Sequence, residues 1–494
     1  MAGKSLERDA KKEVSVAEVV RYGDKLVIPE GMKYAAAIDL IHRRMKYEEE
    51  VVELNETFAA FPYDGARAFG LVLVDKFGWA PSETKPGGFF RPPQPPQLIS
   101  VEVAPGKFEQ IAWGMFSLPT VDGAIDCGVG SVDGGIRFAL SATVKRKDEE
   151  TIKDLFRLTR EKILTDSIYR GKAIKLRFRD DKGNQLAMPE PKFIDTDAID
   201  PNDLIFSREI ESSIETNLFT PIKRVRDCIA NKIPVKRGVM LGGDYGTGKT
   251  MAARIASKYA VEHGLTYVCV LRADELDDAI KFSRLYSDPA CVLFCEDIDR
   301  TMSGERTVKI DDILNTIDGV DSKSLNLITV LTSNHLENIN AAMLRPGRLD
   351  AIIEVTPPDA EAVNRLIRRV AGKSLDADTN IDAACEKLAG NVPAVITEVV
   401  KRAKLSQLSR QPEGTLVEKL TGEALDDAAF TMTKQNDLLR RASAPKPGRP
   451  DLVEALVGVV REAQSTGPNE AKPRIDGTVE LQGMKGKMEG VIIQ

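Results

Sequence analysis

The sequence is poor in the residues that build several common kinds of site. Its 494 residues include only 3 histidines and 6 cysteines, and the cysteines do not have the spacing of metal ligands. Cys291 and Cys295 lie in an apolar run, so we interpret them as buried thiols in a reducing compartment. A zinc site or a histidine-based catalyst is therefore not expected.

Long hydrophobic runs are missing too. No stretch approaches the roughly 18 consecutive apolar residues of a membrane helix, and residues 1–13 lack the apolar core of a secretory signal. The net charge of −6 disfavours a surface built entirely for nucleic acid. With 42% hydrophobic and 29% charged residues, the chain is typical of folded domains, and its length allows about three of them. These features predict a soluble, cytoplasmic protein with no membrane partner.

Regions of different character follow one another along the chain. Residues 1–195 combine helical patterns with short β-rich runs, which predicts an N-terminal α+β accessory or recognition domain. Residues 196–357 alternate apolar strand-like runs with helical patterns, which predicts an α/β domain with a parallel sheet between helices. Residues 358–441 are expected to form a helical lid domain, and residues 442–494, rich in Pro, Gly and Lys, a flexible tail with one short helix at 451–463.

Within the first region, the spacing of apolar residues predicts individual elements. An amphipathic helix is expected over 32–58, followed by helices over 65–77 and 149–165. Strands are expected at residues 98–103, 108–116, 124–129, 136–144 and 173–178.

One motif decides the class of the central domain. Residues 243–250 match the phosphate-binding pattern G-x4-G-K-[ST], between the apolar run 239–241 and a helical run, which is the context that this motif requires. Backbone N–H groups of such a loop converge on phosphate oxygens, Lys249 reaches the β and γ phosphates, and the Thr250 hydroxyl ligates Mg²⁺. The motif therefore predicts ATP and Mg²⁺ as ligands. The residues expected to bind the nucleotide are Gly243, Asp244, Tyr245, Gly246, Thr247, Gly248, Lys249, Thr250 and Met251.

A second element supports this interpretation. The apolar run 292–295 is followed by two acids, Glu296 and Asp297. Ligands of open α/β sheets bind at the carboxyl ends of the strands, so both acids are expected to face the phosphates. Glu296 is predicted to hold Mg²⁺ together with Thr250, and Asp297 to orient and polarise the attacking water. Asp299 suits a helix start or a salt bridge as well as a catalytic role.

Residues ~200–440 resemble the AAA module of the AAA+ ATPases. Besides the phosphate loop, the resemblance rests on residues 295–299 (CEDID), 311–320 (DDILNTIDGV), 332–334 (TSN) and 341–350 (AAMLRPGRLD). It implies that Asn334 is a sensor that helps to position the hydrolytic water. It also implies that Arg345 and Arg348 are arginine fingers for the γ-phosphate bound by a neighbouring subunit. Because a finger that acts in trans needs an oligomer, the resemblance implies a homo-oligomeric ring, with a hexamer as the expected size.

Three features depart from the usual pattern of that family. The strand end has the order Glu296-Asp297 where most relatives have Asp-Glu, and the lid segment 390–394 offers no arginine to sense the γ-phosphate. Residues 271–278 run almost directly into a helix, so there is no room for a substrate-threading pore loop. The acid order, the missing pore loop and residues 233–241 most resemble the branch that moves the folded Rieske protein across the mitochondrial inner membrane. That branch has an N-terminal transmembrane helix, which is not expected here, so only the ATPase module is carried over.

The sequence leaves three functions open. The first is an ATPase ring that remodels or displaces a macromolecular partner, a protein above all, recognised by residues 1–195. The second is an ATPase that acts on nucleic acid, for which basic clusters exist but alternate with acids. The third is a nucleotide-gated scaffold that hydrolyses slowly, which the Glu296-Asp297 order suggests. The basic clusters are His42-Arg43-Arg44, Lys145-Arg146-Lys147, Arg177 with Arg179, and Lys223 with Arg224 and Arg226.

Overall fold

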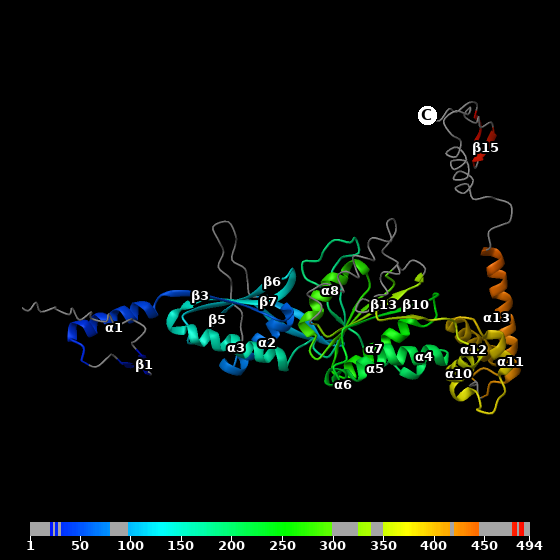
Figure 1. The fold of residues 1–494 in the computed structure, drawn as a ribbon, viewed down its shortest axis with the longest axis horizontal. Coiled ribbons are helices and arrows are strands. Elements are labelled where there is room, and N and C mark those ends of the chain that lie inside the picture. Colours follow the sequence, from blue (N-terminus) through cyan, green and yellow to red (C-terminus); the bar gives the residue numbers. More distant parts are fainter. Residues whose placement is uncertain are drawn as a thin grey trace, which may run out of the picture. The chain divides into compact units, whose positions relative to one another are not determined.

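A computed structural model describes residues 20–22, 25–27, 31–79, 97–298, 325–336, 349–414, 419–443, 477–481 and 484–488. Residues 1–429 form one compact unit and residues 430–494 form a second (Figure 1). The first unit holds a short hairpin of β1 (Val20–Tyr22) and β2 (Lys25–Val27) and two larger sheets.

The N-terminal sheet has five antiparallel strands in the order β3-β7-β6-β5-β4. Helix α2 (Pro62–Phe77) and helix α3 (Glu149–Thr165) pack against each other and against this sheet. The close approach of α2 to β7 requires Gly65, because a β-carbon there would lie 2.1 Å from the ring of Phe138. The strands are β3 (Val51–Phe58), β4 (Gln97–Ala104), β5 (Lys107–Ser117), β6 (Gly123–Val132) and β7 (Gly135–Lys145).

The helix predicted over residues 32–58 is correct only in its first part. Helix α1 (Tyr34–Glu48) ends at the turn that precedes β3. In β3 the exposed residues alternate with half-buried ones, and the whole strand pairs with β7. This period of two belongs to a strand, and the many charged residues on either side of the turn conceal the change of period in the sequence.

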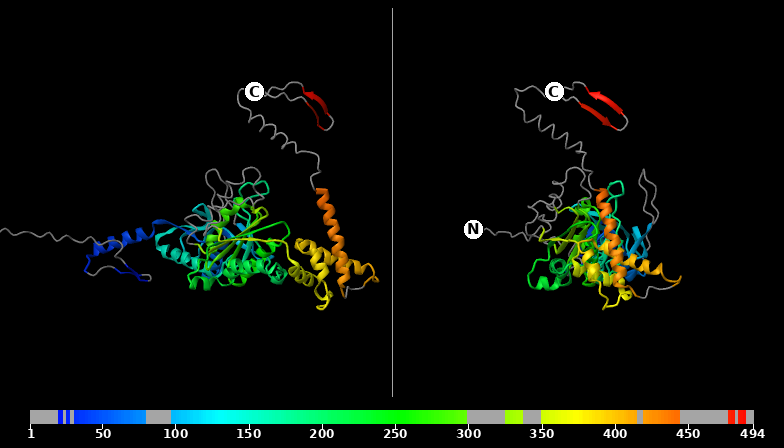
Figure 2. Two further views of the ribbon diagram at one scale, coloured as in Figure 1. Left: turned by 45° about the vertical axis from the view of Figure 1, so that its right-hand side comes forward. Right: turned by 90° about the vertical axis from the view of Figure 1, so that its right-hand side faces the viewer.

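The central sheet has seven strands in the order β14-β10-β13-β12-β11-β8-β9 (Figures 1 and 2). Every neighbouring pair except the last is parallel, as the sequence predicts. The strands are β8 (Ala173–Lys175), β9 (Lys192–Phe193), β10 (Arg237–Gly242), β11 (Thr266–Val270), β12 (Cys291–Cys295), β13 (Leu327–Ser333) and β14 (Ala351–Glu354).

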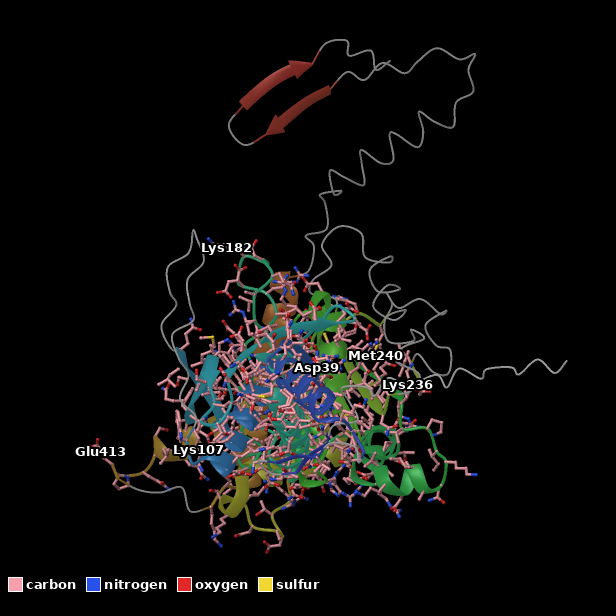
Figure 3. All side chains as sticks on the ribbon, turned by 90° about the vertical axis from the view of Figure 1, so that its left-hand side faces the viewer. Asp39, Lys107, Lys182, Lys236, Met240 and Glu413 are labelled. Carbon is pink, nitrogen blue, oxygen red and sulfur yellow. The ribbon has the colours of Figure 1, made fainter. Side chains whose placement is uncertain are left out.

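Helices cover both faces of this sheet. Helix α7 (Lys249–Glu262) packs its buried alanines on one face, and helix α8 (Leu276–Ser283) packs Ile280 and Phe282 on the other. Alternate residues of β11 and β12 therefore belong to two different apolar clusters. Met240 of β10 is fully buried, whereas Lys107 and Lys182 are exposed, and Figure 3 shows Lys182 at the edge of the molecule.

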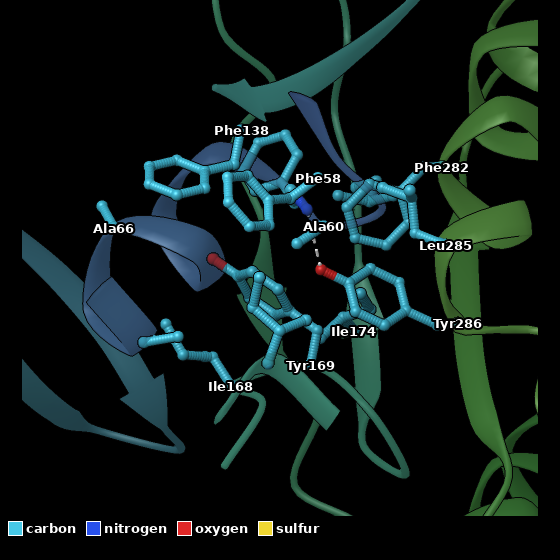
Figure 4. Packing of buried hydrophobic residues seen from close by; sticks show 14 of the residues in the cluster. Phe58, Ala60, Ala66, Phe138, Ile168, Tyr169, Ile174, Phe282, Leu285 and Tyr286 are labelled. Atoms are coloured by element: carbon cyan, nitrogen blue, oxygen red, sulfur yellow. Dashed lines mark hydrogen bonds between the residues drawn. The ribbon is translucent and has the colours of Figure 1, made fainter. Parts of the chain in front are cut away.

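The apolar cluster under α8 is continuous with the core of the N-terminal sheet. It joins Phe58 and Phe138 of that sheet to Phe282 and to Tyr286 of the single turn η6 (Arg284–Tyr286). Figure 4 shows these rings packed together with Tyr169. The two sheets thus share one hydrophobic core.

Two short strands adjust the expected division of the chain. The domain boundaries stay a prediction, but β8 and β9, which precede the boundary expected at residue 195, pair at the edge of the central sheet beside β11. Strands of two or three residues have no measurable periodicity, so the sequence does not show which sheet they join.

The region expected to form the lid is helical, as predicted. It holds α10 (Ala360–Ala371), α11 (Asp382–Leu388), α12 (Pro393–Leu408) and the beginning of α13 (Gly422–Ser443), and α10 packs against both α11 and α12. In the second unit, the described residues form the rest of α13 and a hairpin of β15 (Gly477–Leu481) and β16 (Met484–Met488). The helix predicted at 451–463 lies outside the described residues.

Short elements connect β9 to β10. They are η3 (Pro201–Asp203), α4 (Arg208–Ile214), η4 (Glu215–Phe219), α5 (Thr220–Lys223) and α6 (Val225–Ala230). Within the parts of the chain that the structure describes, no helix has the length and apolar character needed to cross a bilayer.

Candidate nucleotide site

The loop between β10 and α7 has the geometry that the phosphate-binding motif predicts. Gly243, Gly246 and Gly248 all have positive φ angles, of 140°, 80° and 108°. A β-carbon on Gly243 would lie 2.3 Å from the carbonyl oxygen of Val355 at the end of β14. The loop can therefore follow this course only with glycine at that position, which leaves its backbone open to a ligand.

Lys249, the first residue of α7, is buried against this loop. Its Nζ donates hydrogen bonds to the carbonyl oxygens of Gly243 (2.6 Å) and Asp244 (2.8 Å) and to Oδ1 of Asn334 (2.8 Å). The same Asp244 carbonyl also accepts a bond of 2.9 Å from the Thr247 hydroxyl. The ammonium thus sits where the loop, the helix start and the end of β13 meet.

The two acids after β12 bind different partners. Oε1 of Glu296 accepts a 2.8 Å hydrogen bond from the hydroxyl of Thr250. A hydroxyl beside a carboxylate is an oxygen donor set of the kind that Mg²⁺ prefers, so these two residues fit the metal predicted for them.

Asp297 is connected to Asn334. Its Oδ1 accepts a 3.0 Å hydrogen bond from Nδ2 of Asn334, so one amide bridges Asp297 and Lys249. The Asp297 backbone N–H donates to the hydroxyl of Thr332 at 2.9 Å, and the residue has a φ of 43°, which is uncommon outside glycine. This unusual backbone geometry turns the side chain toward Asn334 at the carboxyl edge of the sheet.

The other predicted nucleotide-binding residues lie on or beside the same loop. Tyr245 is exposed at the tip, whereas Thr247 is buried. Met251 packs its side chain on the apolar cluster beneath α7. Arg345, Arg348, Asp299 and residues 311–320 lie outside the described residues, so their roles stay predictions.

Two contacts of the site were not predicted from the sequence, although Thr332 belongs to the TSN segment that carries the family resemblance. The first is the Thr332 hydroxyl, which is buried in β13 and holds the backbone of Asp297. The second is Arg365 of α10, which donates to the carbonyl oxygen of Phe206 (2.6 Å) and to Glu211 (2.6 Å). The ring of Phe206 lies 3.0 Å from the position of a β-carbon on Gly248, so Arg365 ties the lid region to the floor of the loop.

The cysteines are thiols, as the sequence predicts, and most of them are buried. Burial raises the pKa of Cys269 and of Cys291 to about 12, so both stay protonated and unreactive at neutral pH. Among the described residues, no group of three or more His, Cys, Asp or Glu side chains is arranged to hold a metal ion.

A parallel sheet with a glycine loop, a lysine and a threonine after one strand, and acids after a neighbouring strand, defines a P-loop nucleotide-binding protein. Residues 239–357 match the family described as "ATPase family associated with various cellular activities (AAA)". The chain therefore contains an AAA ATPase domain, and this domain includes the phosphate loop, both acids and Asn334.

Curated relatives support this assignment. The chain is 28% identical over 262 residues to the "ATP-dependent zinc metalloprotease FtsH" of Mycobacterium tuberculosis, covering 49% of this chain and 32% of that protein. It is 34% identical over 169 residues to the "Probable mitochondrial chaperone bcs1" of Schizosaccharomyces pombe, covering 31% of this chain and 36% of the relative. The matched region thus spans only about a third of the length of these relatives.

Proposed function

We propose that this protein hydrolyses ATP as a homo-oligomeric ring, a hexamer, and uses the energy to remodel or displace a protein partner. The observation that carries the proposal is the hydrogen-bonded chain from Lys249 through Asn334 to Asp297. It connects the residue that would bind the β and γ phosphates with the residue that would orient the attacking water. Binding of the phosphates and orientation of the water are therefore coupled through one amide.

The individual roles follow from these positions. Lys249 and the backbone N–H groups of the loop would hold the phosphates, and Thr250 with Glu296 would hold Mg²⁺, which neutralises charge on the phosphate oxygens. Asp297 would accept a hydrogen bond from the attacking water, and Asn334 would fix the direction of that carboxylate. In the described structure the ammonium of Lys249 is bound to protein oxygens, so phosphate oxygens would have to replace some of these acceptors.

The ring rests on the resemblance of residues 341–350 to the AAA family. Arg345 or Arg348 would reach the γ-phosphate bound by the adjacent subunit, where a guanidinium stabilises the charge that develops during phosphoryl transfer. The site within one subunit would then be incomplete, and turnover would depend on assembly.

Two observations favour displacement over threading. Only two residues separate β11 from the single turn η5 (Ala273–Glu275), which leads directly into α8, so no loop projects there. The N-terminal domain, proposed to recognise the partner, shares its hydrophobic core with the ATPase sheet. Movements of the sheet would therefore reach the recognition domain through packed side chains.

Nucleic acid is less favoured as a partner because acids neutralise most of the described basic clusters. Lys145, for example, pairs with both Glu49 and Asp122 at 2.5 Å. The other pairs are Arg43–Asp39, Arg44–Glu48, Lys147–Glu49, Arg177–Asp181, Arg179–Asp274, Lys223–Glu215 and Arg224–Asp227. A cytoplasmic location without a membrane partner stays a prediction.

The test is the dependence of ATP turnover on protein concentration. We expect specific activity to rise steeply with concentration as rings assemble, and Lys249→Ala to abolish it. Lys258→Ala, which removes a lysine paired with Glu262 near the C-terminal end of the same helix, is the matched control and should retain activity. If Arg345→Ala and Arg348→Ala both leave turnover unchanged at saturating protein, the active site is complete within one subunit and the ring mechanism is wrong.

A second candidate is a nucleotide-gated scaffold that hydrolyses ATP very slowly. It is favoured by the Glu296-Asp297 order, which makes the residue that faces Asn334 one methylene shorter than the usual glutamate. A single-turnover assay separates the two functions. If phosphate release is no faster than from Asp297→Asn, the scaffold is the better description, whereas a difference of tenfold or more supports the ATPase.

A further inference from the structure

A small cavity of about 60 Å³ lies between the N-terminal sheet and the ATPase core, away from the nucleotide site. Its walls come from the turn between β6 and β7, from the segment 178–189 and from α8. The polar side chains around it are those of Arg137, Gln185, Asp278 and Lys281, and the backbone of Gly134 and Gly135 completes this side. Phe61 and Phe282 close its apolar side, next to the packed rings of Figure 4.

Arg137 is the unusual member of this group. It is only 9% exposed, yet it takes part in none of the ion pairs found among the described residues. Its Nη1 donates two long hydrogen bonds, to the carbonyl oxygens of Ile136 (3.4 Å) and Lys281 (3.5 Å). Burial lowers the pKa of Arg137, and Arg284 adds to this effect, whereas Tyr286 and Asp133 partly offset it. An arginine that is buried to this extent usually forms an ion pair, whereas Arg137 is balanced only by the more distant charge of Asp133.

A second cation lies on the same wall. A β-carbon on Gly135 would lie 3.1 Å from Nη1 of Arg137, and one on Gly134 would lie 3.4 Å from Nζ of Lys281. The guanidinium and the ammonium therefore both pack along the two-glycine turn, where the absence of side chains lets the two cations approach the backbone closely.

The acids near the cavity are already engaged. Lys281 pairs with Asp277 at 2.7 Å and with Asp278 at 3.6 Å. Asp278 also accepts a 3.3 Å hydrogen bond from Gln185. These contacts offset the negative charge of Asp278 on the α8 side, whereas Asp133, in the turn between β6 and β7, acts on Arg137 through its charge alone and forms no ion pair with it.

We propose that this cavity binds one small tetrahedral oxyanion of the size of phosphate, between Arg137 and Lys281. The volume has room for about four to six oxygen-sized atoms, at 10–15 Å³ for each water position. This volume cannot enclose a whole nucleotide or a peptide. The guanidinium fork matches two oxygens of such an anion, and the lysine supplies a third donor.

A bound oxyanion would fasten the two parts of the first compact unit together. It would tie the turn between β6 and β7 to α8, which leads through η6 to β12 and Glu296. The inference does not depend on ATP hydrolysis, because binding can be measured without any turnover.

The test uses the full chain carrying Lys249→Ala, so that the phosphate loop does not contribute. Phosphate at constant ionic strength should raise its melting temperature in a saturable manner, whereas acetate, a carboxylate anion, should not. Arg137→Gln in this background should weaken the apparent phosphate affinity at least tenfold. Arg157→Gln, which removes an exposed arginine from α3, should leave it unchanged. Equal phosphate affinity in the Arg137→Gln and Arg157→Gln proteins would overturn the proposal.

A direct measurement keeps the proposal testable even if Arg137→Gln fails to fold. Crystals of the Lys249→Ala protein soaked in selenate should show an anomalous selenium peak within hydrogen-bond distance of Arg137. Peaks only at the phosphate loop or on the surface would show that Arg137 is a structural clamp on the Lys281 carbonyl and not an anion site.

Discussion

The buried hydroxyl of Tyr286 offers a sensitive test of how the N-terminal domain is joined to the ATPase core. It accepts a 3.1 Å hydrogen bond from the backbone N–H of Phe61, marked by the dashed line in Figure 4, and donates a 3.0 Å bond to Oδ2 of Asp64. Asp64 is buried in the first turn of α2 and also accepts bonds from the Ser167 hydroxyl and the Ile168 N–H. Tyr286→Phe keeps the ring and removes only the hydroxyl group that joins Phe61 to Asp64.

The expected cost follows from the groups left behind. A buried backbone N–H without an acceptor costs about 1–3 kcal/mol, and a lost hydrogen bond to a charged group about 1.5–3 kcal/mol. We therefore expect Tyr286→Phe to lower the free energy of unfolding by about 3 kcal/mol. The matched control is Tyr267→Phe, whose equally buried hydroxyl donates only to the carbonyl oxygen of Ala253, and which should cost about 1 kcal/mol.

The loss of stability in Tyr286→Phe should also depend on pH. Burial raises the pKa of Asp64 above its ordinary value of 3.8, and the bonds from Ser167, Ile168 and Tyr286 partly offset this rise. The folded protein thus holds a proton that the unfolded chain has released, so stability falls as pH rises from 3.8 through the folded-state pKa. Removing the Tyr286 hydroxyl raises that pKa further, so Tyr286→Phe should lose more stability at pH 8 than at pH 4.

The assay is urea unfolding of wild type, Tyr286→Phe and Tyr267→Phe at both pH values. A loss in Tyr286→Phe that equals that of the control, or that does not change with pH, would refute the proposed link between Asp64 and Tyr286. A double-mutant cycle with Asp64→Asn then isolates the coupling, which we expect to exceed 1 kcal/mol.

Two further predictions concern the nucleotide site. Gly243→Ala should cost about 3 kcal/mol of stability and weaken ATP binding more than tenfold, because its β-carbon meets the Val355 carbonyl at a φ of 140°. Urea unfolding and nucleotide titration check this, and a variant that matches wild type in both would contradict the loop geometry. Thr332→Val should reduce turnover about tenfold at unchanged ATP affinity, because it removes the acceptor of the Asp297 N–H, worth about 1–2 kcal/mol. Thr329→Val, on the same buried strand, is the control, and equal turnover in the two variants would exclude this role for Thr332.

The local elements of this protein can be predicted from sequence because each has a contiguous pattern. Residues 243–250 identify the phosphate loop on their own, and runs such as 291–295, apolar at every position, predict strands buried on both faces. The resemblance to the AAA family then indicated Asn334, which the structure places between Lys249 and Asp297.

The contacts between elements were decided only by the tertiary structure. The pair Lys249–Asn334 spans 85 residues, and the bonds of Tyr286 to Phe61 and Asp64 span more than 220. Neither the shared core of the two sheets nor the cavity at Arg137 has a local pattern, because a side chain's partners across such distances depend on how strands are ordered and helices packed. Local sequence fixes which elements form and what chemistry they carry, whereas burial and the meeting of distant groups arise only when the sheets close around a common core.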